Sequence, residues 1–124
     1  LAEGLIKLGV ITQSLEDSLD HDNGQLRDWY MHNTSHWIGL DVHDVGIYKP
    51  NGEPRLFESG MCLTVEPGLY FGSWRPDVDC PERYSNIGIR IEDDVLITDN
   101  GPEVLTSACP KTIADIESIV GKSF

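Results

Sequence analysis

The fold is decided by two stretches, GMCLTVEPGLYF at residues 60–71 and IGIRIEDDVLI at residues 87–97. In both, aliphatic residues recur at every second position, which is the pattern of a β-strand with an apolar face. The same alternation puts Glu66 and Glu92 on the face opposite the aliphatic side chains. We therefore expect two strands that each carry one carboxylate, the first broken by a Pro-Gly pair at 67–68.

Helices and loops are expected around these strands. Residues 1–9 have the apolar spacing of a helix that ends at Gly9, and residues 49–54 are typical of a turn. Residues 72–86 are predicted to form an irregular surface loop. After Pro110, apolar residues at helical spacing predict a last helix that docks on the sheet. The sequence therefore mixes helices and strands.

Length and charge limit the possible classes. The 124 residues are enough for one compact domain. Lysine and arginine total 9 against 21 aspartates and glutamates, a net charge of −12, which disfavours nucleic acid as a partner. The chain begins at Leu1 in a helix-like stretch with no start signal, so we expect a fragment of a longer protein.

Cysteine usage and hydropathy bear on the compartment. The three cysteines have irregular spacing and no Cys-x-x-Cys pair, and are interpreted as reduced thiols. No secretory segment and no apolar run long enough to cross a bilayer is present. We therefore predict a cytoplasmic protein with no membrane partner.

The two carboxylates call for a cationic neighbour. Glu66 and Glu92 have hydrophobic strand neighbours, and a carboxylate left unpaired in such surroundings is costly to desolvate. Arg90, a metal ion or both are the candidates. A solvated surface or turn is the interpretation adopted for four other acidic residues, Asp41, Asp44, Asp93 and Asp94.

Three histidines lie within twelve residues, at positions 32, 36 and 43. If residues 31–37 are extended, His32 and His36 point the same way and both can face one site. A histidine nitrogen with two carboxylate oxygens suits manganese, iron, cobalt or zinc without preference. Each residue alone is more often structural than functional, but the histidines and carboxylates together favour a metal site.

The sequence resembles the carboxyl-terminal catalytic region of aminopeptidase P and its prolidase relatives, through HNTSHWIGLDVHDVGIY at 32–48, SGMCLTVEPGLYF at 59–71 and ERYSNIGIRIEDDVLIT at 82–98. The resemblance covers nearly the whole chain. It implies that residues 1–124 are the carboxyl-terminal portion of a metallopeptidase catalytic domain. The implied fold is α+β, the carboxyl-terminal half of a pita-bread fold, with a curved, mainly antiparallel sheet and flanking helices.

The resemblance also implies two divalent metal ions, commonly manganese, held by two aspartates, one histidine and two glutamates. By motif position the metal ligands in this chain are His36, Glu66 and Glu92. The two aspartates belong to an earlier segment of the family's polypeptide that has no match here. The isolated chain is therefore expected to bind at most one ion, weakly, and to be inactive.

The remaining implied roles are catalytic. Glu66 would shuttle a proton, His32 and His43 would line the substrate pocket and stabilise the oxyanion, and Arg90 would be a charged partner beside the site or the substrate. The implied activity is hydrolysis of the N-terminal peptide bond preceding proline by a metal-bound hydroxide. The substrate would be a peptide with proline in second position.

Two alternatives stay open, a prolidase-type X-Pro dipeptidase and a noncatalytic pita-bread binding module. The Ser-His-Trp core at 35–37 is closer to aminopeptidase P than to prolidase, although Asn33 and Thr34 stand where the family usually has a small residue. Half of a pita-bread sheet would expose an edge and an apolar surface. We therefore expect a homo-oligomer.

Overall fold

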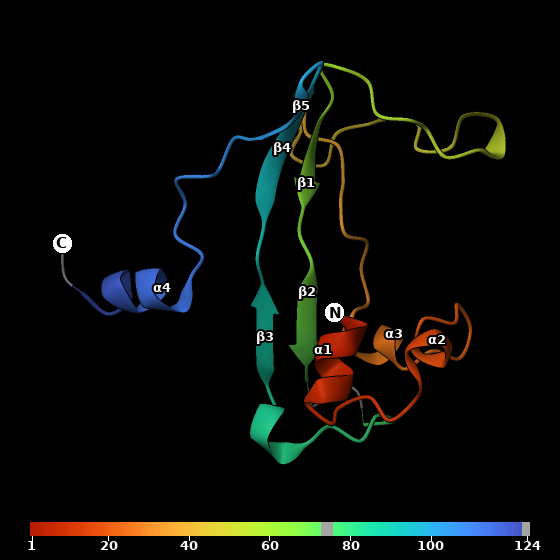
Figure 1. Ribbon diagram of the computed structural model, residues 1–124, viewed down its shortest axis with the longest axis vertical. Coiled ribbons are helices and arrows are strands. Elements are labelled where there is room, and N and C mark those ends of the chain that lie inside the picture. Colours follow the sequence, from red (N-terminus) through yellow and green to blue (C-terminus); the bar gives the residue numbers. More distant parts are fainter. Residues whose placement is uncertain (73–75, 123–124) are drawn as a thin grey trace. The chain divides into compact units, whose positions relative to one another are not determined.

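The computed structural model describes residues 1–72 and 76–122, which form two compact units. The first unit comprises Leu1–Asn33 and Pro67–Arg90, and the second comprises Thr34–Glu66 and Ile91–Phe124. Figure 1 shows the helices and strands of both. The boundaries between the units follow Asn33, Glu66 and Arg90. Each boundary lies at or next to a predicted site residue, namely His32, Glu66 and Arg90.

The first unit holds three short helices and a strand pair. Its elements are α1 Ala2–Lys7, α2 Leu15–Ser18, α3 Leu26–Trp29, β2 Gly68–Phe71, the 3₁₀ turn η2 Glu82–Tyr84 and β3 Ile87–Arg90. The predicted first helix forms but ends at Lys7, two residues before Gly9, whose φ of 70° is a conformation that glycine adopts without strain. The predicted loop at 72–86 contains η2, and its residues 73–75 lie outside the described residues.

The core of the first unit joins its helices to β2. Trp29 at the end of α3 is 4% exposed, and its ring lies 5.0 Å from that of Phe71. Leu5, Val10 and Ile11 complete this cluster of buried side chains. Packing of the Trp29 ring on Phe71 therefore joins α3 to the strand pair.

The second unit is built on a three-stranded antiparallel sheet in the order β1-β4-β5. Its elements are the 3₁₀ turn η1 Pro50–Gly52, β1 Cys62–Val65, β4 Asp93–Thr98, β5 Gly101–Val104 and α4 Ile113–Ile119. Residues 34–38 run along the other edge of β1, where backbone hydrogen bonds join Ile38 to Cys62 and Thr64 to His36. Residues 34–38 thus extend the sheet at its β1 edge, and they include the predicted ligand His36.

The first predicted strand breaks at Pro67, as expected, and the second is also divided in two. The stretch 60–71 divides into β1 and β2 with Glu66 and Pro67 between them, and 87–97 divides into β3 and β4 with Ile91 and Glu92 between them. Pro67 has no amide hydrogen to donate to a ladder, which ends the first pairing. β1 pairs with β4 and β2 pairs with β3. Pairing stops after Val65 and Asp93 and resumes at Gly68 and Arg90, so the two breaks lie opposite each other.

The expected burial of the two faces is only partly correct. Both faces of β1 have buried residues, with Leu63 at 6% exposure on the aliphatic face, Thr64 at 1% on the polar face, and Glu66 at 8% directly after the strand. The aliphatic face of β3 is exposed, since Ile87, Ile89 and Ile91 are 46%, 57% and 47% accessible. Glu92, in the link between β3 and β4, is also exposed, so the expectation that its surroundings make a carboxylate costly to desolvate is met for Glu66 but not for Glu92.

The last helix forms as α4 but does not dock. Thr112 caps it, because its hydroxyl accepts a hydrogen bond from the Asp115 amide. No residue of α4 is buried, and Ile113 is 79% exposed. The predicted packing on the sheet is therefore wrong: local capping supports this helix, and its apolar stripe remains accessible.

Asp93, the first residue of β4, is tied to the segment that precedes α4. Its Oδ1 accepts hydrogen bonds from the Thr106 hydroxyl at 2.6 Å and from Nζ of Lys111 at 2.9 Å. These two donors, with the Thr106 hydrogen bond the larger cause, hold the pKa of the Asp93 carboxyl below its usual value of 3.8. Asp93 therefore links the start of β4 to the segment that precedes α4, in addition to being partly exposed.

We expect this ion pair to make stability depend on pH. A pKa that is lower in the folded state stabilises the fold above the unfolded value, and that contribution is lost as pH falls through the folded value. Asp93→Asn should be less stable than the wild type at pH 7 and should lose stability less steeply below about pH 4. Urea unfolding of both proteins between about pH 7 and pH 3 measures how the free energy of unfolding changes with pH. The same pH dependence in the two proteins would contradict the expectation.

Candidate metal centre

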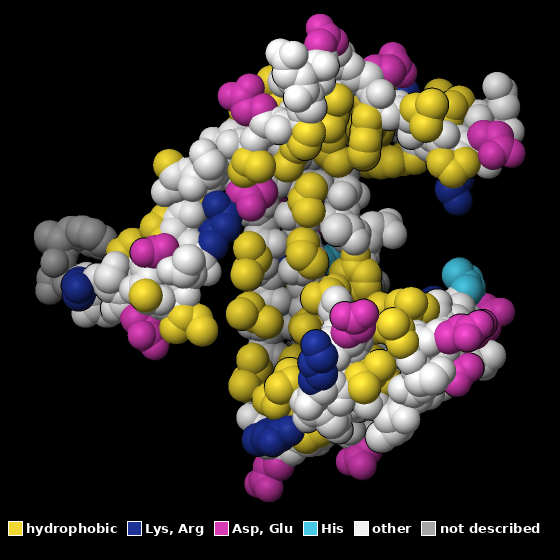
Figure 2. Space-filling view, in the orientation of Figure 1, with side chains coloured by type: hydrophobic (Ala, Val, Ile, Leu, Met, Phe, Trp, Pro, Cys, Tyr) yellow, Lys and Arg dark blue, Asp and Glu magenta, His cyan; other side chains and the backbone are white. Residues whose placement is uncertain are grey.

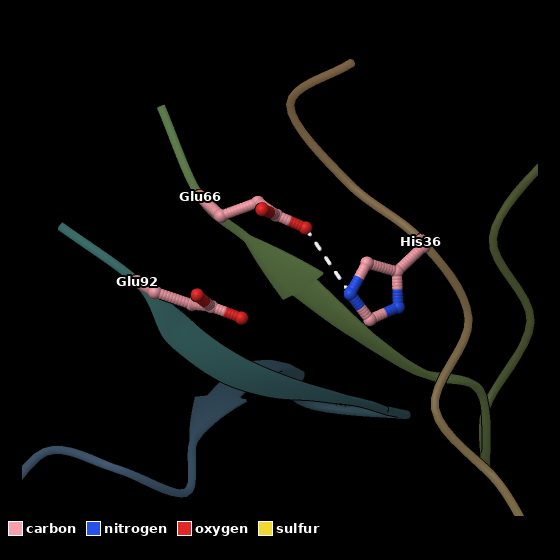
Figure 3. A group of neighbouring side chains, drawn as sticks. All are labelled: His36, Glu66 and Glu92. Atoms are coloured by element: carbon pink, nitrogen blue, oxygen red, sulfur yellow. Dashed lines mark ion pairs between the residues drawn. The ribbon is translucent and has the colours of Figure 1, made fainter. Parts of the chain in front are cut away.

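Three predicted ligands lie together in the second unit. His36 comes from the segment along the edge of β1, Glu66 directly follows β1, and Glu92 directly precedes β4. One ligand atom from each lies within 4.8 Å of the other two, and Figure 3 shows the three side chains directed toward one another. The three residues on which the metal hypothesis depends therefore lie close enough to share one ion.

The register of the sheet explains this convergence. Strands β1 and β4 are antiparallel, with Val65 opposite Asp93. Continuing that register by one residue places Glu66 opposite Glu92. On the other edge of β1, Trp37 bridges Leu63, which puts His36 opposite Thr64, two residues before Glu66 and on the same face.

The His36 ring is oriented by the backbone carbonyl of the next residue, Trp37. Nδ1 lies 3.0 Å from the carbonyl oxygen of Trp37, and because a carbonyl only accepts hydrogen bonds, we assign the proton to Nδ1. Nε2 then faces Oε1 of Glu66 at 3.1 Å. In a neutral ring this nitrogen presents a lone pair, which is the form that binds metals.

The pair formed by His36 and Glu66 fits a shared cation. Two lone pairs that face each other at 3.1 Å repel, so either a proton on Nε2 or a positive ion must lie between them. Ligand atoms bound to one divalent ion at about 2.1 Å, at neighbouring coordination positions, are roughly 3.0–3.4 Å apart. The observed separation falls in that range. The donor set of one imidazole and two carboxylates therefore suits a divalent metal.

Burial adds to the demand for positive charge. The Glu66 side chain is 10% exposed and that of His36 19% exposed. The Thr64 hydroxyl donates a hydrogen bond to Glu66 Oε1 at 3.0 Å. A buried carboxylate loses much of its hydration, and hydrogen bonds together with a cation compensate for that loss.

The catalytic predictions fall in both units. His43 lies beside the candidate ligand His36, since its ring stands edge-on to that of His36 with centroids 4.3 Å apart. His32 belongs to the first unit, where its Nε2 lies 2.9 Å from the Tyr70 hydroxyl. Arg90 ends β3, also in the first unit, opposite Gly68. The roles of these three residues stay predictions.

Two features of the site were not foreseen. Residues 31–37 form no strand, apart from the bridge of Trp37, so the argument that His32 and His36 alternate along one strand is wrong. Strand alternation puts Thr64 on the same face as Glu66, but its direct link to the candidate ligands was not predicted. Its buried position two residues before a carboxylate was the available signal.

Comparison with known proteins decides the family. The model of metallopeptidase family M24 matches residues 4–99. The chain belongs to this family. The sequence is 48% identical over 120 residues to the Xaa-Pro aminopeptidase of Escherichia coli, covering 97% of this chain and 26% of that protein. The predicted relationship is thereby confirmed.

Solved structures of M24 relatives confirm the fold class. The structure of Pseudomonas aeruginosa aminopeptidase PepP matches with a TM-score of 0.84 and 44% identity, over 94% of this chain and 26% of that chain. Zinc-substituted E. coli aminopeptidase P in complex with product matches with a TM-score of 0.81 and 46% identity, over 94% and 25%. The α+β architecture is therefore that of part of a pita-bread fold. The chain spans about a quarter of the length of these relatives.

The helices of the described residues are short. None of them is long and apolar enough to cross a bilayer.

Proposed function

We propose that this chain supplies part of the catalytic domain of a proline-directed metalloaminopeptidase, which hydrolyses the N-terminal peptide bond preceding proline. The observation that carries the proposal is the convergence of His36, Glu66 and Glu92 on one point. Support comes from its M24 membership and from relatives named Xaa-Pro aminopeptidase. Residues 1–124 would then be the carboxyl-terminal portion of the domain.

The complete centre would hold two divalent ions, with Mn²⁺ as the proposed metal. His36 and Glu66 would hold one ion and Glu92 would reach both. A zinc-substituted relative has been crystallised, which agrees with a donor set that does not discriminate sharply among divalent metals. Two aspartate ligands would come from outside these residues, so the chain alone would bind at most one ion, weakly.

Bound divalent ions lower the pKa of water and polarise a carbonyl group. The chain's own residues would handle protons and orientation. Glu66 would accept a proton from the attacking water and pass it to the departing proline nitrogen. His43 and His32 would donate hydrogen bonds to the carbonyl oxygen as it becomes negative, and Arg90 would hold a charged neighbour or substrate group.

The proposed partner is a peptide with proline in second position. The structure of E. coli aminopeptidase P with the inhibitor Pro-Leu supports a peptide ligand, while an X-Pro dipeptide preference would indicate the prolidase alternative. We also propose a cytoplasmic, homo-oligomeric protein. Many hydrophobic side chains are exposed, as Figure 2 shows, including Leu40, Val45 and Leu56 at 83% or more. Sedimentation as a single monomeric species would contradict the oligomer.

Calorimetric titration with Mn²⁺ tests the proposal directly. The wild-type chain is expected to bind one ion weakly, and Glu92→Ala should abolish detectable binding because it removes one of three ligands. Glu103→Ala, in exposed β5, is the matched control and should bind as the wild type does. Absence of any binding that depends on Glu92 would overturn the proposal in favour of a noncatalytic module.

A peptidase assay tests the missing-ligand argument. With excess Mn²⁺ and a peptide with proline second, the isolated chain should show no efficient turnover, because three ligands cannot hold two ions. Turnover comparable to that of an intact aminopeptidase would contradict the claim that two further aspartate ligands are needed. It would not contradict the assignment of His36, Glu66 and Glu92 as ligands.

A further inference from the structure

The hydroxyl of Thr64 connects two of the three candidate ligands. Thr64 lies in β1 and is 1% exposed. Its Oγ1 accepts a hydrogen bond from the backbone amide of His36 at 3.0 Å and donates one to Oε1 of Glu66 at 3.0 Å. One buried atom therefore holds the backbone of the first ligand and the carboxylate of the second.

The bond to His36 departs from regular strand pairing. Along the edge of β1, the amide of Thr64 donates to the His36 carbonyl, and that of Glu66 donates to the Thr34 carbonyl. In a regular antiparallel ladder, two such opposed residues exchange both of their backbone hydrogen bonds. The His36 amide would then reach the carbonyl of Thr64. It reaches the hydroxyl instead.

This exchange directs the hydroxyl hydrogen toward the carboxylate. A threonine hydroxyl carries one hydrogen, and the His36 amide occupies a lone pair, so that hydrogen remains available for Glu66. A hydrogen bond to an ionised acceptor is roughly twice as strong as one between neutral groups. The same Oε1 faces Nε2 of His36 at 3.1 Å, so the hydroxyl acts on the oxygen that meets the imidazole.

We propose that Thr64 is a positioning residue of the metal centre: its hydroxyl holds Glu66 Oε1 against His36 Nε2 before a cation binds. This rests on the proposed function, since it concerns the same metal. A carboxylate oxygen can accept this hydrogen bond and bind a metal at once, so the contact persists in the bound state. Without it, the Glu66 side chain must be ordered at the expense of binding. The competing view is that Thr64 is merely a buried hydroxyl of β1.

Two substitutions separate these views. Thr64→Val keeps the shape and removes the hydroxyl, whereas Thr64→Ser keeps the hydroxyl and removes the methyl group. Ser18→Ala is the matched control: Ser18 is 0% exposed and its hydroxyl donates to the Leu15 carbonyl in the first unit. The readouts are Mn²⁺ affinity by calorimetry, the visible spectrum of bound Co²⁺ and the melting temperature without metal.

Thr64→Val is expected to lower Mn²⁺ affinity by about 10- to 100-fold, the usual effect of removing a group that orients a metal ligand. It should also change the Co²⁺ spectrum. Thr64→Ser should restore both, and Ser18→Ala should lower the melting temperature alone. If the valine variant does not fold, Thr64→Ala carries the same expectation.

Unchanged Mn²⁺ affinity and an unchanged Co²⁺ spectrum in the folded hydroxyl-free variant would overturn the role of Thr64. So would a serine variant that binds as poorly as the valine variant. Both results would leave the proposed function intact, because the wild type would still bind through Glu92. A wild type that binds no metal would overturn the proposed function and this inference together.

Discussion

Glu66→Gln is expected to lower the Mn²⁺ affinity of the chain by at least about 100-fold, since loss of a ligand should exceed the loss of a group that only orients one. Glutamine keeps the shape of the side chain, and its amide oxygen can still accept from Thr64. It lacks the negative charge that holds a cation beside His36. Calorimetry and the rise in melting temperature on adding Mn²⁺ measure the effect, because ligand binding to the folded state stabilises it.

The metal-free Glu66→Gln protein should be at least as stable as the wild type. The Glu66 side chain is 10% exposed, and replacing a buried charge by a neutral group of equal size removes a desolvation penalty. Glu58→Gln is the matched control, because Glu58 is exposed and pairs with Arg55. A variant that keeps wild-type Mn²⁺ affinity would show that Glu66 binds no metal.

Trp29→Ala is the substitution with the largest expected effect on stability. The Trp29 ring is buried against Phe71 and belongs to the same cluster as Leu5, Val10 and Ile11. Its removal therefore loses transfer free energy and leaves a cavity. We expect the free energy of unfolding to fall by about 3–5 kcal/mol, a large part of the total stability of a small protein. Urea unfolding followed by circular dichroism measures this change.

Phe57→Ala provides the control for the tryptophan substitution. Phe57 is 62% exposed, so its truncation should change the free energy of unfolding by no more than about 0.5 kcal/mol. Equal effects of the two substitutions would mean that the core of the first unit does not depend on Trp29.

Much of the candidate site could be predicted from local sequence. The alternation around Glu66 and Glu92 depends only on neighbouring residues, and by the same alternation Glu66 shares its face with Thr64, which donates a hydrogen bond to it. The spaced motifs identified the family, which the M24 match confirms. Strand ends were harder, since a strand stops where its partner stops, and the partner of β1 lies far along the chain.

Other errors share one physical cause. The exposure of Ile87, Ile89 and α4 depends on which segments pack over them, and apolar periodicity records only that a face is apolar. In the described part of the chain, the local capping of α4 by Thr112 exists without burial. Periodicity was therefore sufficient to predict the helix but not its docking.

The sequence by itself determined the family, the chemical identity of the candidate ligands and the strand alternation around Glu66 and Glu92, because these follow from residue type and near-neighbour spacing. Only the tertiary structure decided that His36, Glu66 and Glu92 meet, that Nδ1 of His36 is held by a carbonyl, and that Thr64 joins two of them. The physical reason is register. The pairing of residues 34–38 and β4 on either side of β1 is set by contacts between segments distant in sequence, and a shift of one residue would turn Glu66 away from His36.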